Sequence, residues 1–262
     1  MRIALIHGLG SQRRYMLDLF GPALPSRARV RAPDVRAHGS SPLVGNPSDF
    51  ALESLALEAE HDLSDTAWHP ASSLEELDGA ADPEPLTLIG VSMGAAIALR
   101  IAIAGRVPVE RVLFVRPSFT DVPLPANLVP FAVIGQLLDD LGATEGAARF
   151  RETGIYHDVR AVSALGASGL LAQFGYPLAR ERAMRLVEIP RNRAFSDLTE
   201  LAGLAVPSAV IAAPRDPAHP LPVAEQWAGG LNAPLTVLPA RDDGQAAQTA
   251  ALRSTVAEWI AR

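Results

Sequence analysis

A serine flanked by two glycines is the strongest chemical signal in this sequence. Residues 90–94 read Gly-Val-Ser-Met-Gly, with Ser92 at the centre of a G-x-S-x-G pattern. The run LTLI precedes the motif and the run AAIALRIAIA follows it, which predicts a buried strand before it and an apolar helix after it. Glycines at these two places permit a turn that lifts the serine hydroxyl above a sheet. Ser92 is therefore the predicted nucleophile, and a plain strand-to-helix turn is the alternative interpretation.

A second glycine-rich motif, His7-Gly8-Leu9-Gly10, follows the first apolar run of the chain. Glycines after a buried strand allow backbone N–H groups to face inward. The N–H of Leu9 together with the N–H of Met93 could form a two-donor oxyanion hole, which is usually the largest contribution to catalysis of acyl transfer. The simpler interpretation is a glycine-rich turn between a strand and a helix.

The elements that must position these groups alternate between strands and helices along both ends of the chain. Residues 117–205 show only helical spacing of apolar residues. This pattern predicts an open α/β core of residues 1–115 plus 206–262, with a helical cap (116–205) over the carboxyl ends of the strands. The expected strands are 3–6, 27–31, 86–90, 112–115, 208–213 and 235–238, and the clearest core helices are 15–20, 50–61, 95–104 and 245–260.

Four motifs in this order resemble the α/β-hydrolase superfamily. They are HGLG at 7–10, APDVRAHGSS at 32–41, GVSMG at 90–94 and PRDP at 214–217. The resemblance implies a mainly parallel sheet with helices on both faces and an inserted lid. Because there is no room before Ile3 for the two leading strands common in the family, we expect about six strands. Within the second motif, Asp34, His38 and Gly39 are expected to shape a loop rather than to catalyse.

By the same resemblance, Asp216 falls on the acid of a catalytic triad. Its alternative is a loop carboxylate that pairs with Arg215 or caps the following helix. The family's histidine belongs after the last strand, but residues 238–244 contain none, and Asp243 stands where the imidazole is expected. A carboxylate with an ordinary pKa near 4 is a poor acceptor for a serine proton at neutral pH.

His219 is the best replacement for the missing base, oriented by Asp121 or Asp243. Its alternative is an ordinary place in the loop before a helix, and His157 in the lid is a weaker candidate base. His61 and His69 are expected at the surface. Among these imidazoles, only His219 follows the penultimate strand closely enough to be expected at the rim of the pocket.

Arg116 ends the strand at 112–115, so its guanidinium is expected under the lid. It could bind a carboxylate or phosphate of a substrate in bidentate fashion. A structural ion pair with Asp121 or Asp243 is the favoured alternative. A pair with Asp243 would fill the histidine's place with a salt bridge and weaken any role of that carboxylate as a base.

Composition narrows the class of protein further. The 262 residues are 48% hydrophobic and 20% charged, as in an ordinary globular protein, and no apolar run reaches the roughly 20 residues of a membrane span. The chain has no cysteine, all 23 basic residues are arginine, and the net charge is −6. Disulfides, thiolate metal sites and a Schiff-base lysine are excluded, and nucleic acid is not an expected partner. We expect a cytoplasmic protein without metal or organic cofactor, and the oligomeric state is left open.

The sequence thus predicts a serine hydrolase for a small, largely apolar ester, thioester or lactone. Ser92 is the nucleophile, Leu9 and Met93 supply the oxyanion hole, and Asp216 and His219 complete the catalytic set. Arg116 and Asp243 are candidate substrate-binding residues. Two alternatives are a non-hydrolytic enzyme of the same fold, such as a lyase or cyclase, and a ligand-binding protein that has lost the base.

Overall fold

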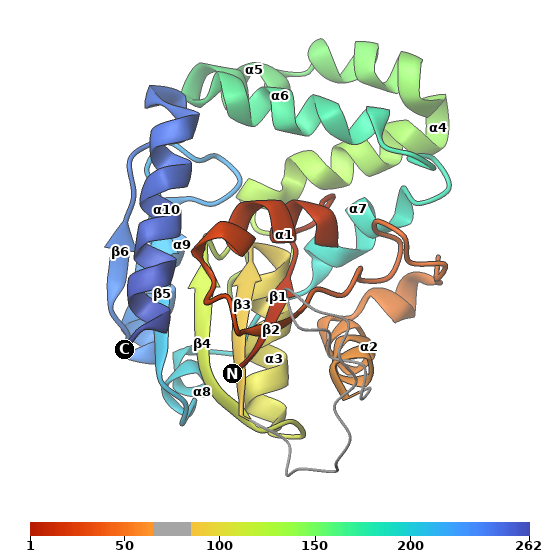
Figure 1. The fold of residues 1–262 in the computed structure, drawn as a ribbon. Helices are drawn as coiled ribbons and strands as arrows, with labels where there is room; N and C mark the ends of the chain where they lie inside the picture. The colour runs from red at the N-terminus through yellow and green to blue at the C-terminus, as the bar shows by residue number, and fades with distance from the viewer. Residues whose placement is uncertain (65–84) are drawn as a thin grey trace.

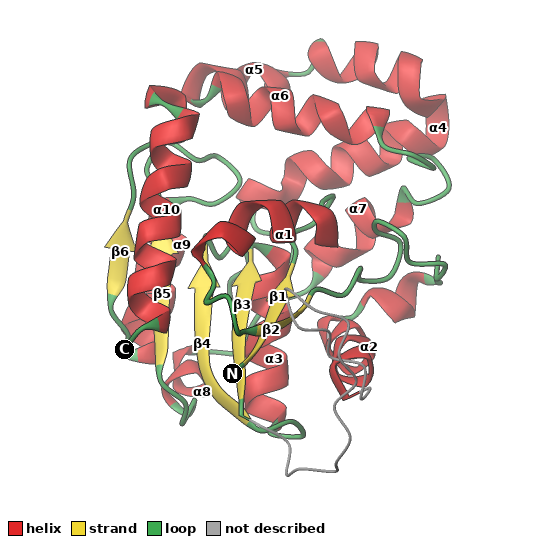
Figure 2. Ribbon diagram, viewed as in Figure 1, coloured by secondary structure: helices red, strands yellow, loops and turns green. Residues whose placement is uncertain are grey.

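A single six-stranded parallel sheet forms the centre of the computed structural model, which describes residues 1–64 and 85–262 (Figure 2). The strand order is β2-β1-β3-β4-β5-β6, and every neighbouring pair is parallel. The predicted open sheet of about six strands is therefore confirmed. The strands are β1 (Arg2–Ile6), β2 (Arg29–Arg31), β3 (Leu86–Val91), β4 (Val109–Val115), β5 (Ser208–Ala212) and β6 (Leu235–Val237).

Successive side chains of a strand point to opposite faces of the sheet and pack into two separate hydrophobic clusters, one on each face. Ile3 and Leu5 of β1 pack with the helices of one face, and Ala4 and Ile6 pack with those of the other. Figure 1 shows the resulting three layers. The first face is covered by α1 (Arg13–Phe20) and α10 (Gln245–Ile260), and the second by α2 (Leu52–Ser64), α3 (Met93–Ala104), α8 (Leu198–Ala202) and α9 (Leu221–Leu231).

Residues 117–205 contain helices and no strand, as the apolar spacing predicted. Figure 1 shows α4, α5 and α6 lying across the end of the sheet toward which the strand arrows point. The first of these helices bends at Gly142, whose φ of 75° is open to glycine and strained for other residues. The helices of this segment are α4 (Val129–Arg151), α5 (Gly154–Val162), α6 (Ala164–Ala172) and α7 (Met184–Glu188), followed by α8.

Short 3-10 turns connect several of these elements. They are η1 (Gly21–Ala23), η2 (Pro47–Phe50), η3 (Ala126–Leu128), η4 (Gln173–Gly175), η5 (Ile189–Arg191) and η6 (Arg241–Asp243). His61 is exposed as expected, whereas His69 lies outside the described residues. In the described part of the chain, no helix is both long and apolar enough to cross a bilayer.

Candidate active site

Ser92 occupies the sharp turn between β3 and α3. Its φ is 57° and its ψ is −115°, a combination that is strained for any residue with a side chain. The residue is buried, with 8% of its surface exposed. Strain of this kind persists only where the surrounding structure holds it, and it is concentrated at functional sites.

The two glycines of the motif hold this turn by close packing rather than by an unusual φ. A Cβ added to Gly90 would lie 2.2 Å from the carbonyl oxygen of Gly94. A Cβ added to Gly94 would lie 2.0 Å from the carbonyl oxygen of Ile6, at the end of β1. The start of α3 is therefore pressed against β1, and only glycine fits at either place.

The loop after β1 lies directly beside the serine. A Cβ added to Gly8 would lie 3.7 Å from Ser92 Oγ. The backbone N–H groups of Leu9 and Met93 have no hydrogen-bond partner among the residues that the structure describes. The two backbone N–H groups that the sequence predicts as oxyanion-hole donors are therefore free to donate a hydrogen bond.

Two buried histidines fix this loop. His7 Nε2 accepts the N–H of Val35 at 3.0 Å, and His38 Nε2 accepts the N–H of Gly10 at 3.1 Å. Each Nδ1 faces a backbone carbonyl, so each ring is neutral with its proton on Nδ1. Burial lowers the pKa of both imidazoles, that of His38 strongly. His38 therefore braces the loop and does not contact the nucleophile.

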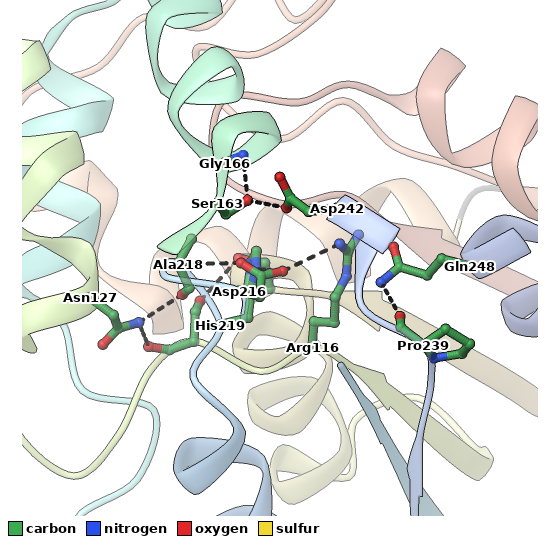
Figure 3. A network of polar contacts seen from close by, with 12 residues as sticks. Arg116, Asn127, Ser163, Gly166, Asp216, Ala218, His219, Pro239, Asp242 and Gln248 are labelled. Carbon is green, nitrogen blue, oxygen red and sulfur yellow. Dashed lines mark hydrogen bonds and ion pairs between the residues drawn. The ribbon is translucent and has the colours of Figure 1, made fainter. Parts of the chain in front are cut away.

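The hydroxyl of Ser92 makes its hydrogen bond with another serine. Ser92 Oγ lies 3.0 Å from Ser118 Oγ, and in the described residues no imidazole is hydrogen-bonded to Ser92. Ser118 is fully buried just after β4, and its carbonyl accepts a hydrogen bond of 2.9 Å from Asn127 Nδ2. The same amide nitrogen donates to the carbonyl of Ala218 at 2.8 Å, which ties the loops after β4 and β5 together (Figure 3).

Asp216 lies at the centre of a largely buried charged cluster after β5. Its Oδ2 is 3.0 Å from His219 Nδ1 and 3.6 Å from Arg116 Nη1 (Figure 3). Burial alone would raise the pKa of Asp216, but His219, Arg116 and Arg241 together hold that pKa well below the usual range. Asp216 is therefore a stable carboxylate whose Oδ2 lies within ion-pair distance of His219 Nδ1, while that nitrogen makes no hydrogen bond within the described residues.

These ion pairs differ from those expected from the sequence. Arg116 pairs with Asp216 rather than with Asp121 or Asp243, and His219 is likewise oriented by Asp216. Arg215 pairs with Asp243 instead of Asp216. The reason is that the strands β4 and β5 are neighbours, so their carboxyl ends bring Arg116 and Asp216 together.

A cavity of about 140 Å³ joins the loop after β1 to the acid–imidazole pair. Pro130, Phe131, Val159 and Leu170 of the helical segment 117–205 line its apolar part, and its polar end holds Asp216, His219 and Arg241. Asp243 does not line it, since its side chain is 62% exposed. The lining residues are Leu9, Asn127, Pro130, Phe131, Val159, Gly166, Gly169, Leu170, Gln173, Asp216, Pro217, Ala218, His219 and Arg241.

Three residues of this site were not predicted from the sequence. Ser118 and Asn127 carry no motif, although Ser118 directly follows the conspicuous Arg116-Pro117 pair at the end of a strand. Arg241 stands two places before Asp243, in the loop after β6, and no pattern in the sequence indicates a role for it. The contacts that place these three residues in the site join distant parts of the chain, so only the tertiary structure shows them.

The sequence itself matches a family model over almost its whole length, in agreement with the fold and with the turn at Ser92. The chain belongs to the alpha/beta hydrolase family, whose model matches residues 3–252.

Solved structures of several enzymes share the fold at low sequence identity. The enol-lactonase from Burkholderia xenovorans LB400 is 20% identical, with a TM-score of 0.71 over 100% of this chain and 91% of that one. MenH from S. aureus is 14% identical, with a TM-score of 0.68 over 98% and 91%. A thermophilic esterase from Thermogutta terrifontis is 17% identical, with a TM-score of 0.66 over 99% and 89%. A sequence comparison with curated proteins gives no match.

Proposed function

We propose that this protein hydrolyses a small, largely apolar carboxylic ester, thioester or lactone, with Ser92 as the nucleophile. The observation that carries the proposal is the strained backbone of Ser92, placed next to the unpartnered N–H groups of Leu9 and Met93. A serine in this setting needs neither a cofactor nor a metal to form an acyl-enzyme. The cytoplasmic location expected from the sequence is part of the same proposal.

The reaction proceeds in two halves. Ser92 Oγ attacks the carbonyl carbon while its proton passes to His219 Nε2, and the N–H groups of Leu9 and Met93 stabilise the resulting oxyanion. The C–O or C–S bond to the leaving group then breaks, and His219 returns the proton to that group. In the second half, water attacks the acyl-serine with the same base, which releases the acid and regenerates Ser92.

Asp216 and His219 supply the base in place of the usual later histidine. Asp216 Oδ2 lies 3.0 Å from Nδ1 of the ring, and both residues line the cavity that also includes Leu9. Ser118 is hydrogen-bonded to the serine hydroxyl. For the proton of Ser92 to pass to His219, the hydroxyl must leave Ser118 and turn toward the imidazole.

The cavity favours a small apolar acyl group. Its volume of about 140 Å³ is close to the ~150 Å³ of an engineered apolar cavity that holds benzene. Phe131, Val159 and Leu170 line the apolar part, while Arg241 and His219 line the polar end. Substrate contacts by Arg116 and Asp243 remain predictions, and the ion pairs of both residues mean that a substrate would first have to displace a carboxylate or a guanidinium.

A fluorophosphonate probe tests the proposal, because it labels only an activated serine. We expect stoichiometric labelling of the wild-type protein, none in Ser92→Ala, and labelling slowed by at least a hundredfold in His219→Ala, in line with the usual contribution of a general base. His61→Ala is the matched control, since this exposed histidine of α2 is expected to leave labelling unchanged. Rapid labelling of His219→Ala would exclude His219 as the base, and no labelling of the wild type would refute serine hydrolysis.

A non-hydrolytic enzyme is the second candidate, and the hydrogen bond between Ser92 and Ser118 favours it. In a lyase or cyclase, Ser92 would stay unacylated and would only donate a hydrogen bond to the reacting group. Turnover of a non-ester substrate that survives in Ser92→Ala would support this candidate. Saturable ligand binding with neither labelling nor turnover would instead indicate the ligand-binding protein.

A further inference from the structure

A second cavity, separate from the one beside His219, lies between the cap and the loops after β1 and β2. Its volume is about 90 Å³, and it shares no lining residue with the first cavity. Two arginines of the cap, Arg182 and Arg185, form its basic wall. The other residues that line it are Gly10, Ser11, Gln12, Ala37, His38, Gly39, Tyr176 and Pro177.

Arg185 is a buried cation without a counter-charge. Only 3% of it is exposed, and it makes one hydrogen bond, from Nη1 to the carbonyl of Arg182 at 2.9 Å. Its Nε is buried with no partner, and within residues 1–64 and 85–262 the titratable groups that act on it are Arg182 and Tyr176, neither of them a carboxylate. A guanidinium carries five N–H donors, and an unpaired buried charge is strongly unfavourable.

Arg182 adds a second positive charge to the same wall. Its Nη1 donates to the carbonyl of Gly39 at 2.8 Å and its Nη2 to the carbonyl of Ser41 at 3.0 Å. These acceptors are neutral, and its Nε is buried without a partner. Burial and the nearby Arg182 lower the pKa of Arg185 to about 10, which still leaves it charged at neutral pH.

Two titratable groups of the loop after β2, Asp34 and His38, supply no free counter-charge. Asp34, which follows β2, accepts the N–H of Arg13 and both the N–H and the hydroxyl of Ser40. His38 is neutral, with both ring nitrogens bonded to backbone. The cavity thus combines two guanidinium groups, one phenol from Tyr176 and no anion from the described chain.

We propose that this cavity binds a small oxyanion, the carboxylate or phosphate group of a ligand. A planar guanidinium binds both groups through two parallel hydrogen bonds. The volume equals that of about three waters at ~30 Å³ each, which accommodates one such group and little more. The ligand is either a free inorganic anion or the acid group of an organic molecule.

A hydrogen bond connects the wall of this cavity to the loop of the candidate active site. His38 lines the cavity and accepts the N–H of Gly10, the residue that follows Leu9. The side chain of Gln173, which lines the first cavity, lies against Gly10 from the other side. The anion site is therefore next to the loop after β1 but does not depend on whether Ser92 is acylated.

Calorimetric titration with inorganic phosphate tests the proposal on the intact protein. We expect saturable binding to the wild type and an increase in melting temperature of about 5 °C at a hundredfold excess over Kd. Arg185→Met should abolish both effects, and its melting temperature without phosphate should not fall, because the substitution removes an uncompensated charge. Arg180→Met removes an exposed arginine of the same segment and should bind phosphate like the wild type.

A parallel titration with phenyl phosphate separates the two sources of the anion. Tighter binding of phenyl phosphate than of phosphate, lost in Arg185→Met, indicates an organic acid, and the reverse order indicates a free ion. If Arg185→Met does not fold, Arg182→Met and Arg185→Lys take its place, each with binding weakened by at least tenfold. No saturable binding to the wild type, or binding unchanged in these variants, overturns the proposal.

Discussion

Replacement of Asp216 by Asn should destabilise the protein strongly although it alters almost no atoms. Asn can still accept the N–H of Ala218, but it removes the negative charge 3.6 Å from Arg116 and 3.0 Å from His219. Coulomb attraction at 3.6 Å with an effective dielectric constant near 20 is about 4–5 kcal/mol. Because the two side chains are 11% and 13% exposed, we expect a loss of about 3 kcal/mol, in the range found when one partner of a buried pair is removed.

Denaturant unfolding of the variant and the wild type measures this difference, and the melting temperature should fall by roughly 6–12 °C. Asp243→Asn is the matched control, because it removes another carboxylate paired with an arginine, but at an exposed site, and should change stability little. An Arg116→Met, Asp216→Asn double variant should recover part of the loss, since no unpaired guanidinium is left buried. Equal small effects of Asp216→Asn and Asp243→Asn would refute the assignment of a buried charge cluster.

The stability difference between the wild type and Asp216→Asn should also depend on pH, in a direction set by the pKa of Asp216. The pKa of Asp216 is depressed in the folded state, whereas in the unfolded chain a carboxyl titrates near 4. Its stabilising contribution is therefore fully present above pH ~4 and is lost as the pH falls below that value toward the folded pKa. The stability gap between wild type and Asp216→Asn should be constant from pH 7 to 5 and should narrow below pH 4.

Three further predictions concern the serine turn and the loop that faces it. Gly94→Ala should cost about 3 kcal/mol or more and abolish fluorophosphonate labelling, because its Cβ meets a backbone oxygen at 2.0 Å, whereas Gly154→Ala, with no atom within 4 Å, should do neither. His38→Gln should flatten the pH dependence of stability measured by urea unfolding, since the wild type, with a depressed folded pKa, should lose up to ~1.4 kcal/mol per pH unit as the pH falls below 6.5. Ser118→Ala should accelerate labelling of Ser92 by about fivefold, the equivalent of one hydrogen bond of ~1 kcal/mol, and slower labelling would show that Ser118 instead assists the nucleophile.

Most of the fold could be predicted from the sequence because the local pattern and the global topology agree. Each short β-branched run became a strand, and the last helix has the predicted limits, 245–260. The errors lie at element ends. The helix expected from residue 95 begins at Met93, since the second half of the serine motif is already helical, and the strand expected from residue 27 begins at Arg29. The division into core and cap at 116–205 stays a prediction, and α8, at the end of that segment, packs on α9 through Leu201 and Gly230.

A residue of the candidate site could be predicted only where the neighbouring sequence fixes its position. The turn at Ser92 needs glycines two residues before and two residues after it, so the pattern can be recognised in the sequence alone. The pairing of Arg116 needs the order of the strands, because its partner Asp216 is far away along the chain, whereas Asp121 lies nearby in the sequence. The same limit hid Arg241, whose side chain reaches the cavity while that of Asp243 turns to Arg215.

The loop after β5 brings an acid and an imidazole together without any residue of the loop after β6. The N–H of Ala218 donates to Asp216 Oδ1 and the N–H of His219 to the Asp216 carbonyl, so a tight turn brings the imidazole back onto the carboxylate three residues before it. An acid–imidazole pair can therefore form without any contribution from the later loop. This carboxylate is also shared with Arg116, and a charge divided between two cations stabilises an imidazolium less than an undivided one. If His219 is the base, Arg116→Met should then make it a stronger one, and the rate of labelling of Ser92 at neutral pH should rise rather than fall.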